Sequence, residues 1–434
     1  MIFKIPKKVI RLLLVLSICM YSCKECPTEN PQNGEDTTIS LNLIHRDCIS
    51  ALIQVEMNVD STQLNTFLLK NDVDTLGEYH FHGSDTALTI SNLEPSTDYS
   101  FLVVSPVNKN KSIRSDTVMF RTMDLSNKQF TAETFRYNTV FMVMRDAWIF
   151  DENNIWVIGT FDLDTDGDGY EEPYNFSIFN GNEWQPKLIE LIGNWGSDII
   201  AFSEDDIWVL ECSPINIMSD FIGERYRLYN QGIIPDTICL QAMYSISPSD
   251  IYFAGPSGSL VHYDGEEFSA LDSGTDFDIV NIDGDEYGNM AYVARNPHNS
   301  QETQVMILKN GKWQELLHSY SVTGNLSEGD YGYLNCLDVF DGFVYIVTFN
   351  HLVRYHFETG NISRIYGRQS GIEMFILDHN DIMIFTSYGS SFFYNGKTFT
   401  EISDGTPDTY YYSGHYNGQM GCIAGDHICI VRQQ

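Results

Sequence analysis

The chain has 434 residues, of which 43% are hydrophobic and 13% aromatic, so it is long enough to bury large cores in two or three domains. Only 19% of the residues are charged, which is too few for a protein of long exposed helices and suits an all-β chain. The 59 acidic residues outnumber the 25 basic ones, and no Lys/Arg cluster could hold a phosphate backbone, so we expect no nucleic-acid partner.

The first 22 residues have the pattern of an export signal. The apolar run Leu12 to Tyr21 is too short to span a bilayer, and it follows four basic residues, Lys4, Lys7, Lys8 and Arg11. The Ser22-Cys23 pair that follows resembles the lipobox of bacterial lipoproteins, in which a small residue precedes the cysteine that is acylated. The resemblance implies that Cys23 is lipidated, with palmitate among its acyl chains, and becomes the mature N-terminus.

This resemblance also implies a cellular location. A lipid anchor alone would hold the chain at the outer membrane, facing the cell exterior or, alternatively, the periplasm. Residues 23–37 are rich in Pro, Asn and Gly and are typical of a flexible tether. The other interpretation is an ordinary secretory signal in which Cys23 is incidental.

Residues 38–124 form the first predicted domain. Alternating runs predict strands from Ser50 to Asp60 and from Thr66 to Asp72. The segment Leu93-Glu94-Pro95-Ser96-Thr97-Asp98-Tyr99 resembles the turn before the sixth strand of a fibronectin type III domain, where the tyrosine hydroxyl hydrogen-bonds back to the chain. The resemblance implies a fibronectin type III-like sandwich, a module that is mostly a spacer in surface proteins.

Residues 125–434 repeat a pattern of short strands and turns every 40 to 50 residues or so, which is typical of β-propeller blades. Each repeat contains one short apolar run, expected to be a strand buried between blades. The seven runs are Ile155 to Gly159, Ile207 to Leu210, Ile251 to Gly255, Met290 to Val293, Val344 to Val347, Ile382 to Phe385 and Met420 to Ile423.

Asn-Gly or Asp-Gly turns precede an aromatic residue in four repeats. These dipeptides favour two-residue hairpins, because both central residues need a positive φ. The aromatic residue is expected to pack on the neighbouring blade. The turns are Asn180-Gly181, Asp264-Gly265, Asn310-Gly311 and Asn395-Gly396.

The last repeat stops too early to supply its own outer strand. Residues 127–131 resemble residues 396–400, so we expect residues 128–136 to complete the last blade and close the ring. The prediction is an all-β chain with a fibronectin type III-like sandwich and a seven-bladed propeller, with six or eight blades as alternatives. Cys422 and Cys429 flank a short turn and are expected to form either a disulfide or two packed thiols.

One loop of the first blade has the pattern of a calcium site. Asp162, Asp164, Asp166 and Asp168 alternate with other residues, and Gly167 follows where a sharp turn is needed. The bidentate Glu expected at the twelfth position is missing. We expect a structural Ca²⁺ here, with a solvated Asp/Gly loop as the alternative.

Long connections between the second and third strands of several blades, such as 162–173 and 211–224, are expected on one face, together with the blade-to-blade loops. That face is the predicted binding face. Aromatic rings among carboxylates and amides suit sugars, although they can equally pack the loops onto the propeller. The candidate ligand-binding residues are Trp195, Tyr331, Tyr410 and Tyr411.

No catalytic motif stands out: the nucleophile elbow, the zinc-protease helix and the phosphate-binding loop are all missing from the sequence. We therefore assign no catalytic residue and expect a monomeric, surface-anchored binding or scaffold protein whose partner is a glycan or a protein. The alternative is a carbohydrate-active hydrolase or lyase with its site on the propeller loop face.

Overall fold

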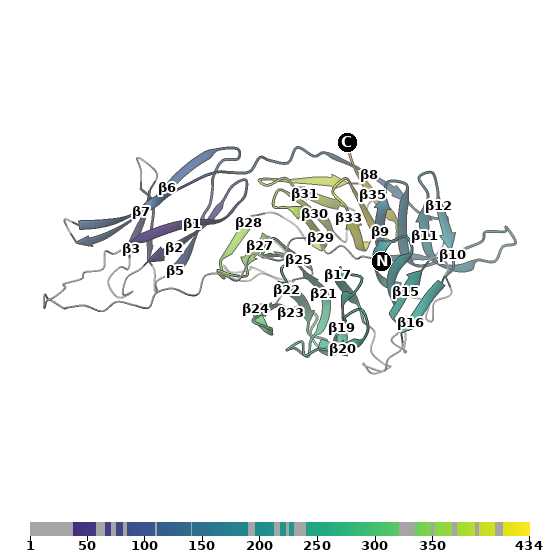
Figure 1. Ribbon diagram of the computed structural model, residues 1–434. Helices are drawn as coiled ribbons and strands as arrows, with labels where there is room; N and C mark the ends of the chain where they lie inside the picture. Colours follow the sequence, from purple (N-terminus) through teal and green to yellow (C-terminus); the bar gives the residue numbers. More distant parts are fainter. Residues whose placement is uncertain are drawn as a thin grey trace, which may run out of the picture. The chain divides into compact units, whose positions relative to one another are not determined.

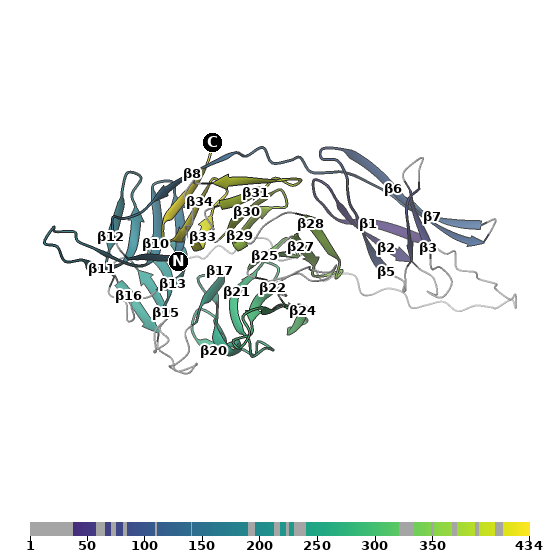
Figure 2. The same cartoon turned by 180° about the vertical axis from the view of Figure 1, so that it is seen from behind.

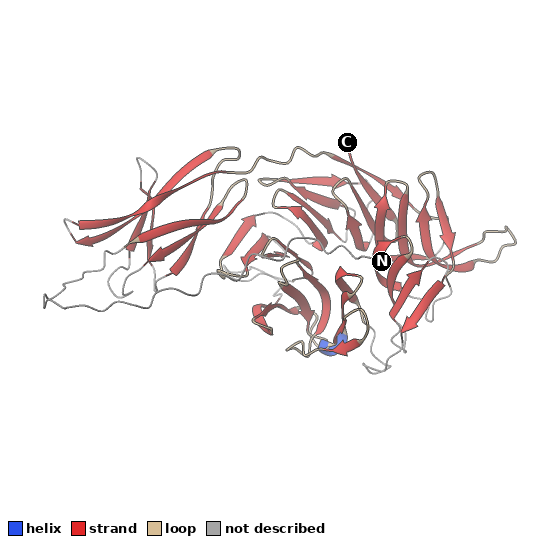
Figure 3. Ribbon diagram, viewed as in Figure 1, coloured by secondary structure: helices blue, strands red, loops and turns tan. Residues whose placement is uncertain are grey.

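The computed structural model consists almost entirely of β-strands, with one short 3₁₀ turn at Pro256–Gly258 (Figure 3). It describes residues 38–57, 66–70, 75–80, 85–108, 111–139, 141–189, 196–211, 218–222, 225–229, 240–320, 334, 336–348, 351–366, 371–386, 390–403 and 411–434. Among these residues, no helix is long and apolar enough to cross a membrane. Residues 38–434 form one compact unit.

The first seven strands belong to residues 38–124 and form two sheets, with the orders β1-β2-β5 and β4-β3-β6-β7 (Figure 1). Apolar residues of both sheets, such as Ile53 and Phe101, share one core. The strands are β1 (Ile39–Arg46), β2 (Ala51–Met57), β3 (Thr66–Lys70), β4 (Thr75–His80), β5 (Asp85–Ile90), β6 (Asp98–Asn108) and β7 (Lys111–Arg121).

The turn before β6 holds the hydrogen bond expected from the sequence. The backbone N–H of Glu94 donates to the hydroxyl oxygen of Tyr99 at 2.8 Å, and the Tyr99 ring stacks on Phe101. Because the two sheets share one core, they form a sandwich. The assignment of this sandwich to the fibronectin type III family stays a prediction.

The remaining strands form seven four-stranded antiparallel sheets within the described residues, which is the architecture of a seven-bladed propeller (Figure 1). Blades 1 to 3 comprise β9 (Met142–Asp151), β10 (Asn154–Leu163), β11 (Glu172–Phe179) and β12 (Trp184–Lys187); β13 (Gly196–Ser203), β14 (Asp206–Glu211), β15 (Met218–Ile222) and β16 (Arg225–Tyr229); β17 (Ala242–Ser247), β18 (Asp250–Ala254), β19 (Leu260–Tyr263) and β20 (Phe268–Ala270).

Blades 4 to 6 comprise β21 (Asp278–Gly284), β22 (Met290–Arg295), β23 (Glu302–Lys309) and β24 (Lys312–Tyr320); β25 (Cys336–Phe340), β26 (Phe343–Val347), β27 (His351–His356) and β28 (Ile362–Tyr366); β29 (Gly371–Asp378), β30 (Asp381–Thr386), β31 (Ser390–Tyr394) and β32 (Phe399–Ser403). Blade 7 comprises β33 (Tyr411–Tyr416), β34 (Met420–Gly425), β35 (Ile428–Gln433) and β8 (Phe130–Phe135).

The seven apolar runs are the second strands of the blades, as predicted. Strands β26, β30 and β34 are buried along their whole length because both of their faces pack against other blades. The sequence signal was strong in these strands because, apart from Asp381 at the start of β30, their side chains are apolar or small.

Strand β8 closes the ring, which also confirms a prediction. It pairs antiparallel with β35 from Phe130↔Gln433 to Phe135↔Ile428, so the start of the propeller supplies the outer strand of its last blade. Figure 2 shows β8 beside the C-terminal strands from behind. Phe135 stacks on Trp184 of blade 1 at 5.8 Å between ring centroids, so an outer-strand aromatic does pack on the neighbouring blade.

The hairpin turns differ from the prediction in three of four places. Asn310-Gly311 is a two-residue turn with both φ values positive, at 55° and 70°. The other three connect their strands through four residues, and only the glycine has a positive φ. In these turns the Asn or Asp side chain accepts hydrogen bonds from the backbone N–H groups two and three residues later, as Asn395 does from Lys397 and Thr398 at 3.0 and 2.9 Å.

Two further expectations need correction or completion. The predicted loop 211–224 contains strand β15 (Met218–Ile222), in which the adjacent polar residues Ser219 and Asp220 interrupt the alternation expected of a strand. Cys422 lies opposite Ile430 and Cys429 opposite Ile423, so the two thiols do not face each other. They pack in separate hydrophobic clusters, which favours packed thiols over a disulfide.

Candidate binding site in the central channel

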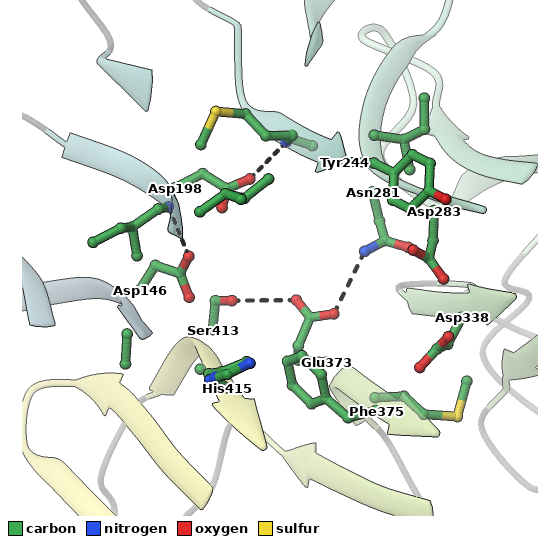
Figure 4. Close-up of a pocket in the computed structure, with 18 of the residues that line it drawn as sticks. Asp146, Asp198, Tyr244, Asn281, Asp283, Asp338, Glu373, Phe375, Ser413 and His415 are labelled. Carbon is green, nitrogen blue, oxygen red and sulfur yellow. Dashed lines mark hydrogen bonds between the residues drawn. The ribbon is translucent and has the colours of Figure 1, made fainter. Parts of the chain in front are cut away.

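A cavity of about 790 Å³ lies at the centre of the propeller (Figure 4). All seven inner strands contribute to its wall: β9, β13, β17, β21, β25, β29 and β33. A space of this size, formed by the fold itself, is in the range of small-molecule binding sites.

Five acidic side chains line this cavity, and they are called the channel acids below. They are Asp146, Asp198, Asp283, Asp338 and Glu373, from five different inner strands. Each is a polar residue on a strand whose neighbouring positions are mostly apolar.

Four channel acids connect adjacent blades. In each case a carboxylate oxygen accepts a hydrogen bond from a backbone N–H on the inner strand of the next blade, and Figure 4 shows the bonds of Asp146 and Asp198. The pairs are Asp146 with Ile199 at 3.0 Å, Asp198 with Met243 at 2.6 Å, Asp283 with Val339 at 2.6 Å, and Asp338 with Ile376 at 2.7 Å. These carboxylates therefore have a structural role before any other.

Other polar groups extend this belt around the channel. His415 of blade 7 accepts a hydrogen bond at Nδ1 from the backbone N–H of Ile149 in blade 1, at 3.0 Å. Ser413 donates to Glu373 at 3.2 Å and so connects blades 7 and 6. These hydrogen bonds at the channel thus link six pairs of adjacent blades, and away from the channel Asp278 of blade 4 accepts a hydrogen bond from the backbone N–H of Ser257 in blade 3 at 2.9 Å.

Burial raises the pKa of every channel acid. Glu373 reaches a pKa of about 8, through burial and then the charge of Asp198. Asp283 reaches about 6, and the pKa values of Asp146 and Asp338 lie well above the ordinary value, through burial and a neighbouring carboxylate. Near neutral pH the cavity therefore holds protonated carboxyls, which can donate as well as accept hydrogen bonds.

Basic and aromatic groups complete the wall. Arg145 lies over the Tyr412 ring, with 4.5 Å from its guanidinium carbon to the ring centroid, and Tyr412 is 40% exposed. Trp148 stacks on His415 with 4.2 Å between ring centroids. This mixture of donors, acceptors and flat rings suits a polar ligand with apolar faces.

The ligand-binding residues predicted from the sequence are not brought together here. Trp195, Tyr331 and Tyr410 lie outside the described residues. Tyr411 is 2% exposed and packs in the core of blades 6 and 7, so its ring is not available to a ligand. Its neighbour Tyr412 points to the opposite side of β33 and lines the cavity instead.

The channel acids were not predicted, because the repeated pattern in the sequence lies in the second strand of each blade, whereas these acids lie in the first. A signal was present: a single acid interrupts an apolar run, as Asp338 does in Cys336-Leu337-Asp338-Val339-Phe340. In β9, the adjacent pair Arg145-Asp146 interrupts an apolar run in a similar way.

The predicted calcium loop is brought together in part. The carboxylates of Asp164, Asp166 and Asp168 lie within 4.8 Å of one another and are exposed. Asp162 is a residue of β10 and does not belong to this group. Asp164 accepts hydrogen bonds from the backbone N–H groups of Gly167 and Gly169 at 2.6 and 3.0 Å, so the loop is folded around it. Calcium binding stays a prediction.

Comparison with known proteins bears on the fold. No family model and no curated protein matches the chain. The Pan2 WD40 domain of Neurospora crassa is similar, with a TM-score of 0.51 and 9% identity, over 71% of this chain and 96% of that domain. The similarity shows a propeller fold and nothing more.

Two structures of the extracellular domain of a putative two component system or one component system from B. thetaiotaomicron were also found. They have TM-scores of 0.48 and 0.46 and identities of 12% and 11%, over 69% and 92% of this chain. The chain spans 40% and 59% of those two domains.

Proposed function

We propose that this chain is a lipid-anchored cell-surface protein whose propeller binds a glycan or a protein partner in its central cavity. Cys23 supplies the anchor, the outer membrane is the location, and the sandwich is a spacer of the fibronectin type III kind. The observation that carries the binding role is the cavity of about 790 Å³, lined by all seven inner strands.

The chemistry of the wall favours a hydroxylated ligand. Sugar hydroxyls both donate and accept hydrogen bonds, and protonated and ionised carboxyls together can match them. Arg145 adds a fixed donor, and the Tyr412 ring adds a flat face for the C–H groups of a sugar. A protein partner would use the same cavity by inserting a polar side chain.

A binding role is favoured over catalysis because four of the five channel acids already hold the blades together through hydrogen bonds. Asp146, Asp198, Asp283 and Asp338 each accept a backbone hydrogen bond from the next blade. A group fixed in this way stabilises the ring and is a poor candidate for moving toward a substrate.

Glu373 supports the alternative of a carbohydrate-active enzyme. The side chains of Ser413 and Asn281 donate to it at 3.2 and 3.5 Å, within the described residues it accepts no backbone hydrogen bond from the next blade, and its pKa of about 8 keeps a proton available at neutral pH. A general acid in glycoside hydrolysis needs such a raised pKa.

The test is binding of the detergent-solubilised full chain to a panel of immobilised polysaccharides, with the soluble products analysed for cleavage. Tyr412→Ala is expected to weaken binding about tenfold, or about 1.4 kcal/mol. Tyr287→Ala is the matched control, because Tyr287 is 69% exposed and does not line the cavity.

The outcomes separate the candidates. Binding without cleavage supports the glycan-binding role, and cleavage that Glu373→Gln abolishes supports the enzyme. If no polysaccharide is retained, the glycan proposal fails and a protein partner is sought by crosslinking. Metabolic labelling with palmitate tests the anchor: Cys23→Ala should abolish the label, and a labelled variant would contradict it.

A further inference from the structure

Three potential metal ligands meet where the sandwich contacts blades 5 and 6. They are His45, Asp341 and His379, and one ligand atom from each lies within 4.8 Å of the others. None of these residues belongs to the central cavity or to the acidic loop of blade 1.

Local backbone structure brings each side chain to this point. Asp341 is the first residue of a two-residue hairpin between β25 and β26, where it and Gly342 have φ values of 49° and 77°. His379 lies in the corresponding hairpin of the next blade, between β29 and β30. His45 follows an irregularity in β1, where the register with β2 shifts between Leu43 and His45, and such bulges re-aim side chains.

The geometry among the three is close. His379 Nε2 and Asp341 Oδ2 are 3.2 Å apart, and the rings of His45 and His379 are 4.0 Å apart at an angle of 65°. Tyr345 is hydrogen-bonded to the other ring nitrogen of His379, Nδ1, and so fixes the orientation of that imidazole. Ring nitrogens of metal-bound histidines commonly have such a partner.

One atom in the group lacks a hydrogen bond. His45 Nε2 is buried and has no partner among the described residues. A buried polar atom without a partner destabilises the folded state, because it has lost its hydrogen bonds to water. An ion bonded to this nitrogen would remove that destabilisation.

We propose that His45, His379 and Asp341 bind a divalent transition-metal ion of the Zn²⁺ class, using Nε2 of both histidines and the Asp341 carboxylate. Two imidazoles and one carboxylate are a common ligand set for zinc. The Asp341 side chain is 54% exposed, which gives the ion a route from solvent and leaves room for a water ligand.

The surrounding charges are compatible with a cation. Arg354 and Asp47 form a buried ion pair nearby, and their charges cancel each other. The Asp341 carboxylate therefore gives the group of three ligands a negative charge. The Asp341 Oδ2 atom lies 3.2 Å from His379 Nε2, so this negative charge is beside the imidazoles that would share the ion.

Such an ion would clamp two parts of the chain together. His45 belongs to β1 of the sandwich, whereas the other two ligands belong to the propeller. Because the ligands converge only in the folded state, metal binding would stabilise this contact against separation.

The experiment uses the detergent-solubilised full chain, stripped with a chelator and then titrated with Zn²⁺ in a calorimeter and with Co²⁺ by visible absorption. One ion per chain is expected, with Co²⁺ bands of a site that includes nitrogen ligands. His45→Gln and Asp341→Asn should each weaken Zn²⁺ binding at least about tenfold. Asn tolerates the positive φ at position 341, so this second variant tests the site even if His45→Gln folds poorly.

His262→Ala is the matched control, because His262 forms a comparable pair with Asp250 at 2.7 Å but belongs to no group of three potential metal ligands within the described part of the chain. It should leave Zn²⁺ binding unchanged. The proposal is overturned if no Zn²⁺ binds, or if Asp341→Asn binds as tightly as the parent chain. It is also overturned if binding is lost in Asp166→Asn instead, which would place the ion in the acidic loop.

Discussion

Arg354 shows how one residue can hold the sandwich on the propeller. Its guanidinium pairs with Asp47, and both side chains are almost fully buried, at 5% and 3% exposure. Arg354 Nη2 also donates to Ser50 Oγ at 3.1 Å. Removing one member of a buried pair leaves the other charge uncompensated, so we predict that Arg354→Met lowers the free energy of unfolding by about 3–5 kcal/mol.

Urea denaturation followed by tyrosine and tryptophan fluorescence measures this effect. Lys397→Met is the control, because Lys397 and Glu94 also connect propeller and sandwich, but with side chains 41% and 70% exposed. An exposed pair contributes about 0–1 kcal/mol. Equal losses in the two variants would show that burial does not determine the strength of this contact.

Glu373 should make the propeller less stable as pH rises. Its pKa is about 8 in the folded chain, through burial first and the charge of Asp198 second, and 4.5 is its ordinary value. Between these two values the folded state binds more protons than the unfolded state. The contribution of Glu373 to the free energy of unfolding is therefore greatest below about pH 4.5 and declines up to about pH 8. Melting temperatures at pH 5 and pH 8.5 should show this decline, and Glu373→Gln should reduce it. An unchanged slope in the variant would assign the decline to the other channel acids.

At the scale of single elements, the loop between β10 and β11 offers a test of the calcium prediction. Asp164, Asp166 and Asp168 are close enough to share one ion, and their mutual repulsion would fall when it binds. We predict that Ca²⁺ raises the melting temperature and that chelation reverses the rise. Asp166→Asn should remove the response, whereas Asp162→Asn should preserve it, since Asp162 lies outside the group. A melting temperature indifferent to Ca²⁺ would favour the solvated loop.

The elements that the sequence revealed are those determined by local patterns. Val344 to Val347 is apolar at every position, and a strand buried on both faces needs that composition. Strand β8 was found through its likeness to residues 396–400, although its partner β35 is about 300 residues away in the chain. The turn at Asn395 was predicted wrongly as a two-residue hairpin. The Asn395 side chain accepts hydrogen bonds from the backbone N–H groups of Lys397 and Thr398 and stabilises a four-residue connection, in which only Gly396 has a positive φ.

The candidate sites were harder to predict because they depend on contacts between repeats. Asp146 is one acid among 59, and only the fold shows that it meets Ile199 of the next blade. His45 and His379 are separated by more than 300 residues, and a bulge in β1 determines where His45 points. Tyr411 was chosen as an exposed aromatic, but strand alternation buries it and exposes Tyr412.

For the whole molecule, pairing of β8 with β35 should stabilise the propeller more than the pairing of any other outer strand, because it also closes the ring. The other blades are each continuous in sequence, whereas blade 7 joins the two ends of the propeller. Without β8, strand β35 becomes an open edge, and such an edge invites pairing between chains. We predict that the double variant Ala132→Pro, Glu133→Pro disrupts this pairing, because one of two successive residues must donate toward β35.

The matched control is Ser269→Pro, Ala270→Pro in β20, the outer strand of blade 3, which is continuous with its own blade. Thermal unfolding should show a melting temperature for the β8 variant that is lower than that of the control by about 4 °C or more. For a domain of this size, such a shift corresponds to a loss of more than about 1 kcal/mol in the free energy of unfolding. Light scattering should detect oligomers for the β8 variant alone. Equal melting temperatures and no oligomers would mean that blades 7 and 1 hold together through their packed faces, with β8 contributing no more than any other outer strand.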